Sequence, residues 1–264
     1  MPDPSNSDDL QEMRQEQNLL RQCISTCNTR LWQTTRQAAS DLNSKEPEWA
    51  ILRFIGGVDL SCHKDDQTKA CAALVVLRLP DLEVVYKDFI VDDVTVPYIP
   101  GFLGAREYPL ISRLLDRIRD KSPELFPQVL LVDGNGILHP RGCGSACYVG
   151  VKEKVPCIGV AKTFFHLPGW SDTFEDDLRK TLISHGDSAD MVHDGRVVGK
   201  ALIASKKSTN PVFVSVGHGI DLETAVWVVL LCSKYRVSEP VRQADQLSRQ
   251  IINNLSKLPL GTLC

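Results

Sequence analysis

The sequence has few aromatic residues and no long hydrophobic run. Aromatic side chains make up 6% of the 264 residues, and methionine occurs 3 times. No apolar stretch approaches the roughly 18 residues that a membrane-spanning helix needs. Residues 1–10 are polar and acidic and lack the apolar segment of a secretory signal peptide. We therefore expect a globular protein without membrane contact, located in the cytoplasm.

An excess of positive charge is also absent. The formal net charge is -3, whereas strong nucleic-acid binders usually have a basic balance, so any nucleic-acid site must be a local patch. Cys23 with Cys27, and Cys143 with Cys147, are each four apart, but no second close pair completes a zinc site. We interpret the nine cysteines as reduced and mostly buried side chains.

No linker rich in proline, glycine or serine divides the chain. The composition, 43% hydrophobic and 24% charged, is typical of a globular protein. We predict a disordered N-terminus over residues 1–8, a single domain over 9–256 and a C-terminal tail over 257–264.

The hydrophobic periodicity predicts an α/β fold. Helices are expected over residues 9–43, 106–119, 142–151, 174–184, 221–235 and 239–255, and strands over 49–59, 72–79, 82–91, 128–132, 157–160, 197–204 and 212–216. Pro80-Asp81 joins two strands so tightly that they must form an antiparallel hairpin. The short apolar strands after residue 128 alternate with helices, which indicates parallel pairing. This order is typical of a ribonuclease-H-like mixed sheet, with three antiparallel strands followed by parallel ones and helices at the flanks.

Four carboxylates occur where charged side chains are unusual. Asp59 interrupts a buried apolar strand, and Asp133 ends the apolar run of residues 129–132. Glu107 and Asp245 fall on the apolar faces of their predicted helices. Charged residues are rarely buried unless they are paired or bind a metal. Because hard cations take oxygen ligands, we predict a site for Mg²⁺, with Mn²⁺ as a substitute.

Three further polar residues are candidates for the same site. Asp133 and Lys162 both follow short strands, and open α/β sheets bind ligands at the carboxyl ends of such strands. Lys162 could stabilise charge on a phosphate. His218 closes the strand over 212–216 and His139 follows the Asp133 loop, so either could serve as acid, base or phosphate contact. Each of the three is also compatible with a structural or surface role.

At these residues the sequence resembles the endonuclease V family. The matching segments, in the family's order, are Gly57-Val58-Asp59, Pro97-Tyr98-Ile99-Pro100-Gly101-Phe102-Leu103, Arg106-Glu107, residues 132–141, Gly159-Val160-Ala161-Lys162 and Ser215-Val216-Gly217-His218. A single Asp-Gly-x-Gly motif would be weak, but motifs in this order are highly specific. The resemblance covers about residues 49–250.

The resemblance implies a role for each matched residue. The metal-binding catalytic acids would be Asp59, Glu107 and Asp133, with Asp245 close by as a further ligand. The phosphate or the attacking water would be supported by Lys162, His139 and His218. A wedge inserted beside the modified base would consist of Pro97, Tyr98, Ile99 and Pro100. A pocket for the flipped base would be lined by Gly101, Leu103, Gly134, Gly136 and Ala161.

The implied reaction is metal-dependent hydrolysis of the phosphodiester one nucleotide to the 3′ side of inosine, leaving 3′-hydroxyl and 5′-phosphate ends. The segment around Asp245 looks like the animal type, which favours single-stranded inosine-containing RNA as the partner. DNA with deoxyinosine, and hence a role in DNA repair, stays open because the two substrates differ by a 2′-hydroxyl group. We expect a monomer, present in the nucleus or nucleolus as well as in the cytoplasm.

Three other functions are compatible with parts of this pattern. A ribonuclease-H-like nuclease without inosine specificity would share the metal site but not the wedge and pocket. A nucleotide-binding kinase or ATPase of the actin-like branch would use strand-Asp-Gly turns to hold phosphates. A non-catalytic inosine reader would not need the costly set of Asp59, Glu107, Asp133 and Lys162.

Overall fold

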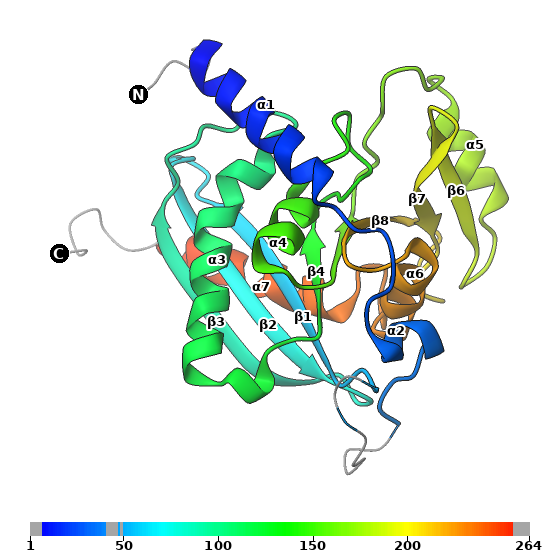
Figure 1. Cartoon of the computed structure of the whole chain (residues 1–264), viewed down its shortest axis with the longest axis horizontal. Helices are drawn as coiled ribbons and strands as arrows, with labels where there is room; N and C mark the ends of the chain where they lie inside the picture. The colour runs from blue at the N-terminus through cyan, green and yellow to red at the C-terminus, as the bar shows by residue number, and fades with distance from the viewer. Residues whose placement is uncertain (1–6, 41–46, 48–49, 256–264) are drawn as a thin grey trace.

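The computed structural model describes residues 7–40, 47 and 50–255. Its centre is one eight-stranded mixed sheet with the strand order β3-β2-β1-β4-β5-β8-β7-β6. Helices cover both faces of this sheet (Figure 1). The predicted α/β fold class is therefore confirmed.

The strands follow the predicted order with one addition. They are β1 (Phe54–Cys62), β2 (Lys69–Arg78), β3 (Glu83–Asp93), β4 (Val129–Asp133), β5 (Cys157–Ala161), β6 (Ser188–His193), β7 (Arg196–Leu202) and β8 (Val212–His218). Strands β1, β2 and β3 are antiparallel, and β4 and β5 run parallel to β1. Beyond β5 the expectation of parallel strands is wrong, because β8, β7 and β6 are all antiparallel to their neighbours.

Two helical layers enclose the sheet. The helices are α1 (Ser7–Gln22), α2 (Leu31–Thr35), α3 (Leu103–Lys121), α4 (Ser145–Glu153), α5 (Phe174–Thr181), α6 (Leu222–Leu231) and α7 (Glu239–Leu255), with a 3₁₀ turn at Pro123–Leu125. On one face, Val58 and Leu74 pack with Leu114 of α3. On the other face, Val75 packs with Ala244 of α7. Because successive residues of a strand point to opposite faces, Asp59 lies on the α7 face.

The N-terminal helix is shorter than predicted. Helix α1 begins at Ser7 and ends at Gln22, so the single helix expected over residues 9–43 is wrong. Short polar side chains follow, and such side chains compete with the helical hydrogen bonds of the backbone. Asn28 also attaches this segment to the start of α6, because its amide donates to Asp221 Oδ2 at 2.6 Å and to Thr224 Oγ1 at 3.0 Å. Residues 1–6, 41–46 and 256–264, which include most of the predicted disordered N-terminus and the whole predicted tail, lie outside the described residues.

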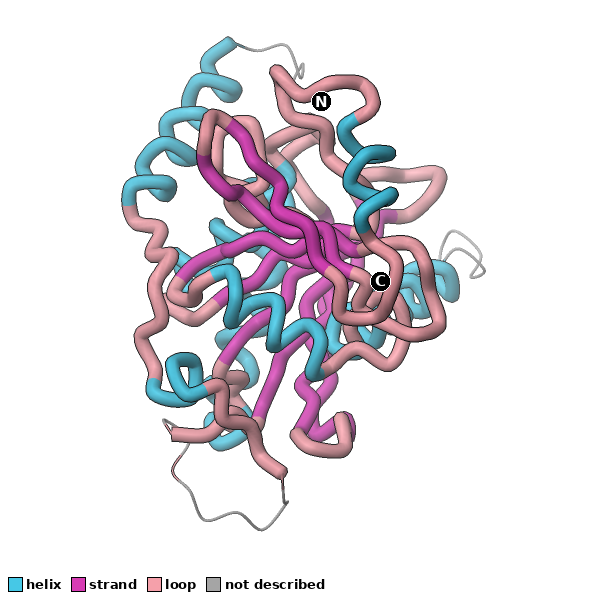
Figure 2. Tube along the Cα trace, turned by 90° about the vertical axis from the view of Figure 1, so that its right-hand side faces the viewer, coloured by secondary structure: helices cyan, strands magenta, loops and turns pink. Residues whose placement is uncertain are grey.

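A small lobe is attached to the end of the sheet. It consists of α5 and the hairpin of β6 and β7, which projects toward the viewer in Figure 2. The sequence predicted β7 but not β6, because only one residue of β6, Met191, is buried. Phe164, Trp170 and Phe174 stack together beside this hairpin. Within the described part of the chain, no helix has the length and apolarity that crossing a bilayer requires.

Candidate active site

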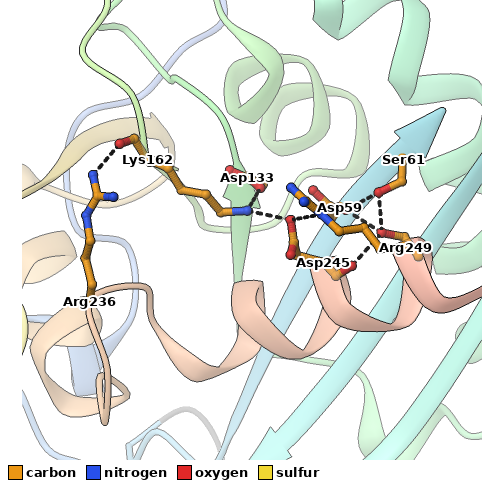
Figure 3. A network of polar contacts seen from close by, with 8 residues as sticks. Asp59, Ser61, Asp133, Lys162, Arg236, Asp245 and Arg249 are labelled. Atoms are coloured by element: carbon orange, nitrogen blue, oxygen red, sulfur yellow. Dashed lines mark hydrogen bonds and ion pairs between the residues drawn. The ribbon is translucent and has the colours of Figure 1, made fainter. Parts of the chain in front are cut away.

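Three of the predicted acids meet at one edge of the sheet. One carboxylate oxygen each of Asp59, Asp133 and Asp245 lies within 4.8 Å of the other two. Asp59 comes from the middle of β1, Asp133 is the last residue of β4, and Asp245 lies on the face of α7 that packs on β1 and β2. Figure 3 shows the three side chains turned toward one another. Residues far apart in the sequence therefore form one acidic cluster.

Lys162 completes this cluster with a positive charge. It directly follows β5, and its Nζ atom lies 2.5 Å from Asp133 Oδ2 and 2.6 Å from Asp245 Oδ1. Burial disfavours the charged ammonium, but the two carboxylates outweigh burial and raise the pKa of Lys162. Arg236 donates to the backbone carbonyl of Lys162, which holds the start of this loop in place (Figure 3). The lysine therefore stays charged beside the acids.

Asp59 is the most buried of the three clustered acids, with 8% of its surface exposed. Its pKa is raised to about 7, mainly because burial penalises the charged carboxylate and also because Asp133 repels it. A hydrogen bond from Ser248 Oγ to Asp59 Oδ2, at 2.6 Å, acts in the opposite direction. Ser248 is itself fully buried, and its hydroxyl lies 2.8 Å from that of Ser61. Hydroxyl groups therefore bind Asp59 directly, and the charge of Lys162 also favours its ionised form.

Glu107 approaches from the other helical layer. It lies in the first turns of α3, outside the three-acid cluster. Burial raises the pKa of Glu107 to about 8, a hydrogen bond with Ser145 lowers it, and the charges of Asp59 and Asp133 raise it further. Because the charges of both aspartates act on Glu107, this residue lies near the cluster. Its carboxylate is not one of the three that lie within 4.8 Å of one another.

A divalent cation fits this arrangement of acids. Carboxylate oxygens are the preferred ligands of hard cations, and 4.8 Å is short enough for three of them to share one ion. Besides burial, the charge of Asp133 raises the pKa of Asp59 even with Lys162 present, so a cation bound between the acids would relieve this repulsion. Asp59, Asp133 and Asp245 would hold the ion, and Glu107 is a further carboxylate on which the charges of Asp59 and Asp133 act.

A small cavity lies beside the acids. Its volume is about 160 Å³, and it is lined by Tyr98, Pro100, Gly101, Leu103, Gly104, Gly134, Asn135, His139, Gly144, Ser145 and Phe165. Three of the five predicted pocket residues, Gly101, Leu103 and Gly134, are among them. From the predicted wedge, Tyr98 and Pro100 line the cavity, and Pro97 and Ile99 lie in the same loop. Tyr98 is 61% exposed, so its ring is available to a ligand.

The other two predicted pocket residues, Gly136 and Ala161, lie elsewhere. A side chain at Gly136 would collide with the backbone oxygen of Val216, at 2.0 Å, so this glycine is needed for close packing on β8. Ala161 is buried in an apolar cluster with Leu138 and Phe213. Neither residue lines the cavity. Their glycine and alanine types reflect tight packing behind the pocket.

His139 forms part of the cavity wall as a neutral ring. The backbone N–H of Arg141 donates to Nδ1 at 3.2 Å, so Nε2 carries the proton and donates to the carbonyl of Gly101 at 3.1 Å. Burial and the charge of Arg141 lower the pKa of His139 to about 4. The ring stacks at 6.2 Å from Phe165. These contacts favour a role in shaping the pocket over proton transfer.

His218 does not join the site. Cys157, the first residue of β5, pairs with His218, whereas Asp133 pairs with Val160 near the other end of that strand. The predicted role of His218 assumed a parallel β8, and the antiparallel direction places this residue at the opposite edge of the sheet. There its Nδ1 accepts a hydrogen bond from the backbone of Ser25. The prediction of a catalytic or phosphate contact is therefore corrected.

Several site residues were not selected from the sequence. Ser248 lies three residues after Asp245, so helical spacing could have identified it. Ser145, Asn135 and Phe165 carry no local signal of this kind, because loops and helix ends bring them to the site.

Comparisons with known proteins agree with this geometry. Residues 30–246 match the model of the family described as endonuclease V. The human endonuclease V is 42% identical over 248 residues, which cover 93% of this chain and 84% of the human protein. The mouse endonuclease V is 44% identical over 210 residues, 79% of this chain and 62% of the mouse protein.

Solved structures show the same fold. The crystal structure of the catalytic domain of human endonuclease V has a TM-score of 0.86 and 40% identity, covering 96% of this chain and 99% of that one. An endonuclease V of Ciona intestinalis, solved with a 23-nucleotide DNA that contains an inosine followed by a ribo-adenosine, has a TM-score of 0.81 and 31% identity. It covers 95% of this chain and 99% of that one.

Proposed function

This chain belongs to the endonuclease V family, and from that premise we propose that it hydrolyses the phosphodiester one nucleotide to the 3′ side of inosine. It is a phosphodiester-hydrolysing nuclease with an acidic site suited to a divalent metal. The proposal rests mainly on the fact that the acidic cluster and the cavity are joined by two consecutive residues of the chain. Asp133 belongs to the acidic cluster, and the next residue, Gly134, lines the cavity. A base bound in the cavity would therefore hold its own strand against the acids.

The residues of the cluster would have different roles in hydrolysis. A divalent cation bound there would polarise the scissile phosphate and lower the pKa of a water molecule. Asp59, Asp133 and Asp245 would hold that cation. Lys162 keeps its positive charge beside two of them, where it can stabilise negative charge on the phosphate.

The pocket offers hydrogen-bonding groups that suit hypoxanthine. The side-chain oxygen of Asn135 is buried and has no hydrogen-bond partner among the described residues. A buried acceptor without a partner is costly, so a bound N–H donor would satisfy it. Hypoxanthine has an N–H group at ring position 1, whereas adenine has an acceptor there. This difference supports inosine over adenosine as the base that is bound.

The loop of residues 97–100 supports extrusion of that base. Two prolines restrict its backbone, and Tyr98 extends from it into solvent at the rim of the cavity. Stacking on an aromatic ring stabilises an unpaired base by roughly 1–3 kcal/mol. Tyr98 could therefore occupy the space that the flipped base leaves in the strand.

We propose single-stranded inosine-containing RNA as the preferred substrate, with DNA containing deoxyinosine as a second one. Two observations support RNA: the animal-type segment around Asp245, and the ribo-adenosine that follows inosine in the ligand of the Ciona intestinalis relative. We propose Mg²⁺ as the ion and Mn²⁺ as its substitute, since both prefer carboxylate oxygens. The same proposal includes a monomer that acts in the cytoplasm and in the nucleus or nucleolus.

The decisive experiment uses four matched oligonucleotides. RNA and DNA strands, each with one inosine or one adenosine at the same position, are incubated with the protein and Mg²⁺, with and without a chelator. We expect cleavage of the inosine strands one nucleotide to the 3′ side, faster for RNA, and no cleavage with the chelator. Asp59→Ala should abolish cleavage and leave the fold intact.

Each alternative function predicts a different result. Equal cleavage of inosine and adenosine strands would indicate a nuclease without base specificity. Inosine-dependent binding that persists with the chelator, without cleavage, would indicate a reader. Release of phosphate from ATP without strand cleavage would indicate a kinase or ATPase.

A further inference from the structure

Helix α1 contributes a buried polar side chain to the pocket. The helix precedes residue 30, where the match to the family model begins. Among the residues of α1 whose burial is described, only Gln17 is buried, with 1% of its surface exposed. A fully buried glutamine must place both ends of its amide on partners, because an unpaired amide is costly to bury.

All partners of Gln17 lie in the two loops beside the cavity. Its Nε2 group donates to the backbone carbonyls of Gly101, at 2.8 Å, and Cys143, at 3.0 Å. Its Oε1 atom accepts a hydrogen bond from the Nε group of Arg141. Both N–H groups and the oxygen are thus used, and none of these bonds goes to the sheet or to another helix.

The two carbonyls belong to two different loops that line the cavity. Gly101 lines it directly, at the end of the loop of residues 97–100. Cys143 immediately precedes Gly144, which also lines it. A single planar amide that binds both carbonyls sets the spacing between these two loops, because its two N–H groups are rigidly connected.

The Gly101 carbonyl is held more firmly than an ordinary loop carbonyl. Besides Gln17, it accepts hydrogen bonds from His139 Nε2, at 3.1 Å, and from the guanidinium of Arg141. Gly101 has a φ of +82°, which suits glycine and few other residues. Three donors therefore fix the residue at which the wedge loop turns into the pocket.

We infer that Gln17 is a positioning residue for recognition of the flipped base, and that α1 is part of the recognition site. This inference rests on the proposed function. Gln17 touches neither the acids nor the scissile phosphate, and it acts by holding Gly101 and the chain at Cys143 at the distance that admits a base. Loss of its hydrogen bonds should weaken binding of the base and leave the chemical step unchanged.

The neighbouring residue provides a matched control. Glu16 attaches the same helix to α4, through Lys152 at 2.5 Å and the hydroxyl of Tyr148 at 3.3 Å, and these contacts involve neither of the two loops that Gln17 joins. Glu16→Ala therefore removes an attachment of α1 and leaves the pocket spacing intact. Gln17→Glu replaces the donor by a carboxylate that repels both carbonyl oxygens. Gln17→Met removes all three hydrogen bonds at similar size.

The test is steady-state cleavage of a short single-stranded RNA with one inosine, in the presence of Mg²⁺. We expect KM to rise about tenfold in Gln17→Glu and Gln17→Met, equivalent to about 1.4 kcal/mol, and kcat to change less than twofold. Glu16→Ala should leave both constants near those of the wild type. Without Mg²⁺, binding of the inosine strand should weaken in both Gln17 variants, and binding of the adenosine strand should not.

Several outcomes would overturn the inference. An unchanged KM in both Gln17 variants, or a fall in kcat and thermal stability that Glu16→Ala reproduces, would assign Gln17 to helix attachment alone. Loss of the folded state in both Gln17 variants would also assign Gln17 to helix attachment alone. If the wild type itself binds inosine and adenosine strands equally, the proposed function fails, and that result is separate from any effect of Gln17.

Discussion

Ser248 donates a hydrogen bond to Oδ2 of Asp59 at 2.6 Å, in the interior between α7 and β1. Both the donor and the acceptor are polar side chains that are buried. Burial and the charge of Asp133 both disfavour the ionised form of Asp59. The hydroxyl therefore supports the ionised form of the carboxylate, which is the form that binds a cation.

Ser248→Ala should weaken binding of Mg²⁺ by roughly tenfold, since hydrogen bonds to charged groups contribute about 1.5–3 kcal/mol. Ser61, whose hydroxyl lies 3.4 Å from the same oxygen, is too distant to replace it fully. Calorimetric titration of the metal-free protein measures the affinity. Ser248→Thr, which keeps the hydroxyl, and Asn253→Ala, an exposed change on the same helix, should stay near the wild type. Equal affinities in Ser248→Ala and the wild type would contradict this role.

The acidic cluster illustrates what the sequence could predict. Buried strands and helix faces are local patterns, and a carboxylate that interrupts one is visible without coordinates. Asp59, Asp133 and Asp245 were selected in this way, Lys162 was selected because it follows a short apolar strand, and the structure brings the four together. The five-strand core from β1 to β5 was predicted for the same reason, because each strand is a short apolar run between clear turns.

The incorrect predictions concern features that depend on distant contacts. The residues of β8 carry no signal that the strand runs antiparallel to β5. His218, which ends β8, was therefore expected at the wrong edge of the sheet. Gly136 has the residue type of a pocket glycine, but close packing on Val216 accounts for it. Gln17 lies in a helix whose amphipathic pattern is ordinary, and only the folded loops show what its amide binds. These positions are determined by tertiary packing, which overrides local pattern.

Binding of the cation should depend on pH. The pKa of Asp59 is raised to about 7 and that of Glu107 to about 8 in the metal-free protein. Both groups are largely protonated at pH 6, and a proton must leave before a carboxylate can bind a cation. The apparent affinity for Mg²⁺ should therefore rise between pH 6 and 8, by up to about tenfold per pH unit for each proton released, and level off above pH 8.

Calorimetry in two buffers of different ionisation enthalpy would measure this release of protons directly. In Glu107→Gln, the apparent affinity for Mg²⁺ should lose the part of its increase with pH that occurs nearest to pH 8. An affinity that is constant between pH 6 and 8 would show that the carboxylates are already ionised without metal.

Asp59→Asn should stabilise the metal-free protein while abolishing cleavage. The folded-state pKa of Asp59, about 7, lies above its ordinary value of 3.8. Its contribution to stability is therefore fully present below about pH 4 and is lost as the pH rises through 7. Because asparagine does not ionise, the variant should avoid a loss of about 4 kcal/mol at pH 8.

Urea unfolding of the metal-free proteins at pH 5 and pH 8 would measure this difference. The wild type should have a lower free energy of unfolding at pH 8 than at pH 5. Asp59→Asn should reduce this gap between the two pH values. Asp65→Asn, a change at an exposed acid, should leave the gap unchanged. A wild-type stability that rises with pH across this range would reverse the predicted sign.

Asn135→Leu should reduce discrimination between inosine and adenosine. The side-chain oxygen of Asn135 is a buried acceptor without a partner in the described part of the chain, and leucine has a similar size but no acceptor. For inosine strands we expect kcat/KM to fall about tenfold, equivalent to about 1.4 kcal/mol, because the base would lose one hydrogen bond in the pocket. The rate with adenosine strands should not fall. Asn135→Asp, which keeps an oxygen acceptor, should retain more of the preference for inosine than Asn135→Leu. If both variants discriminate as well as the wild type, backbone groups alone select the base, and the orphaned oxygen of Asn135 has no part in recognition.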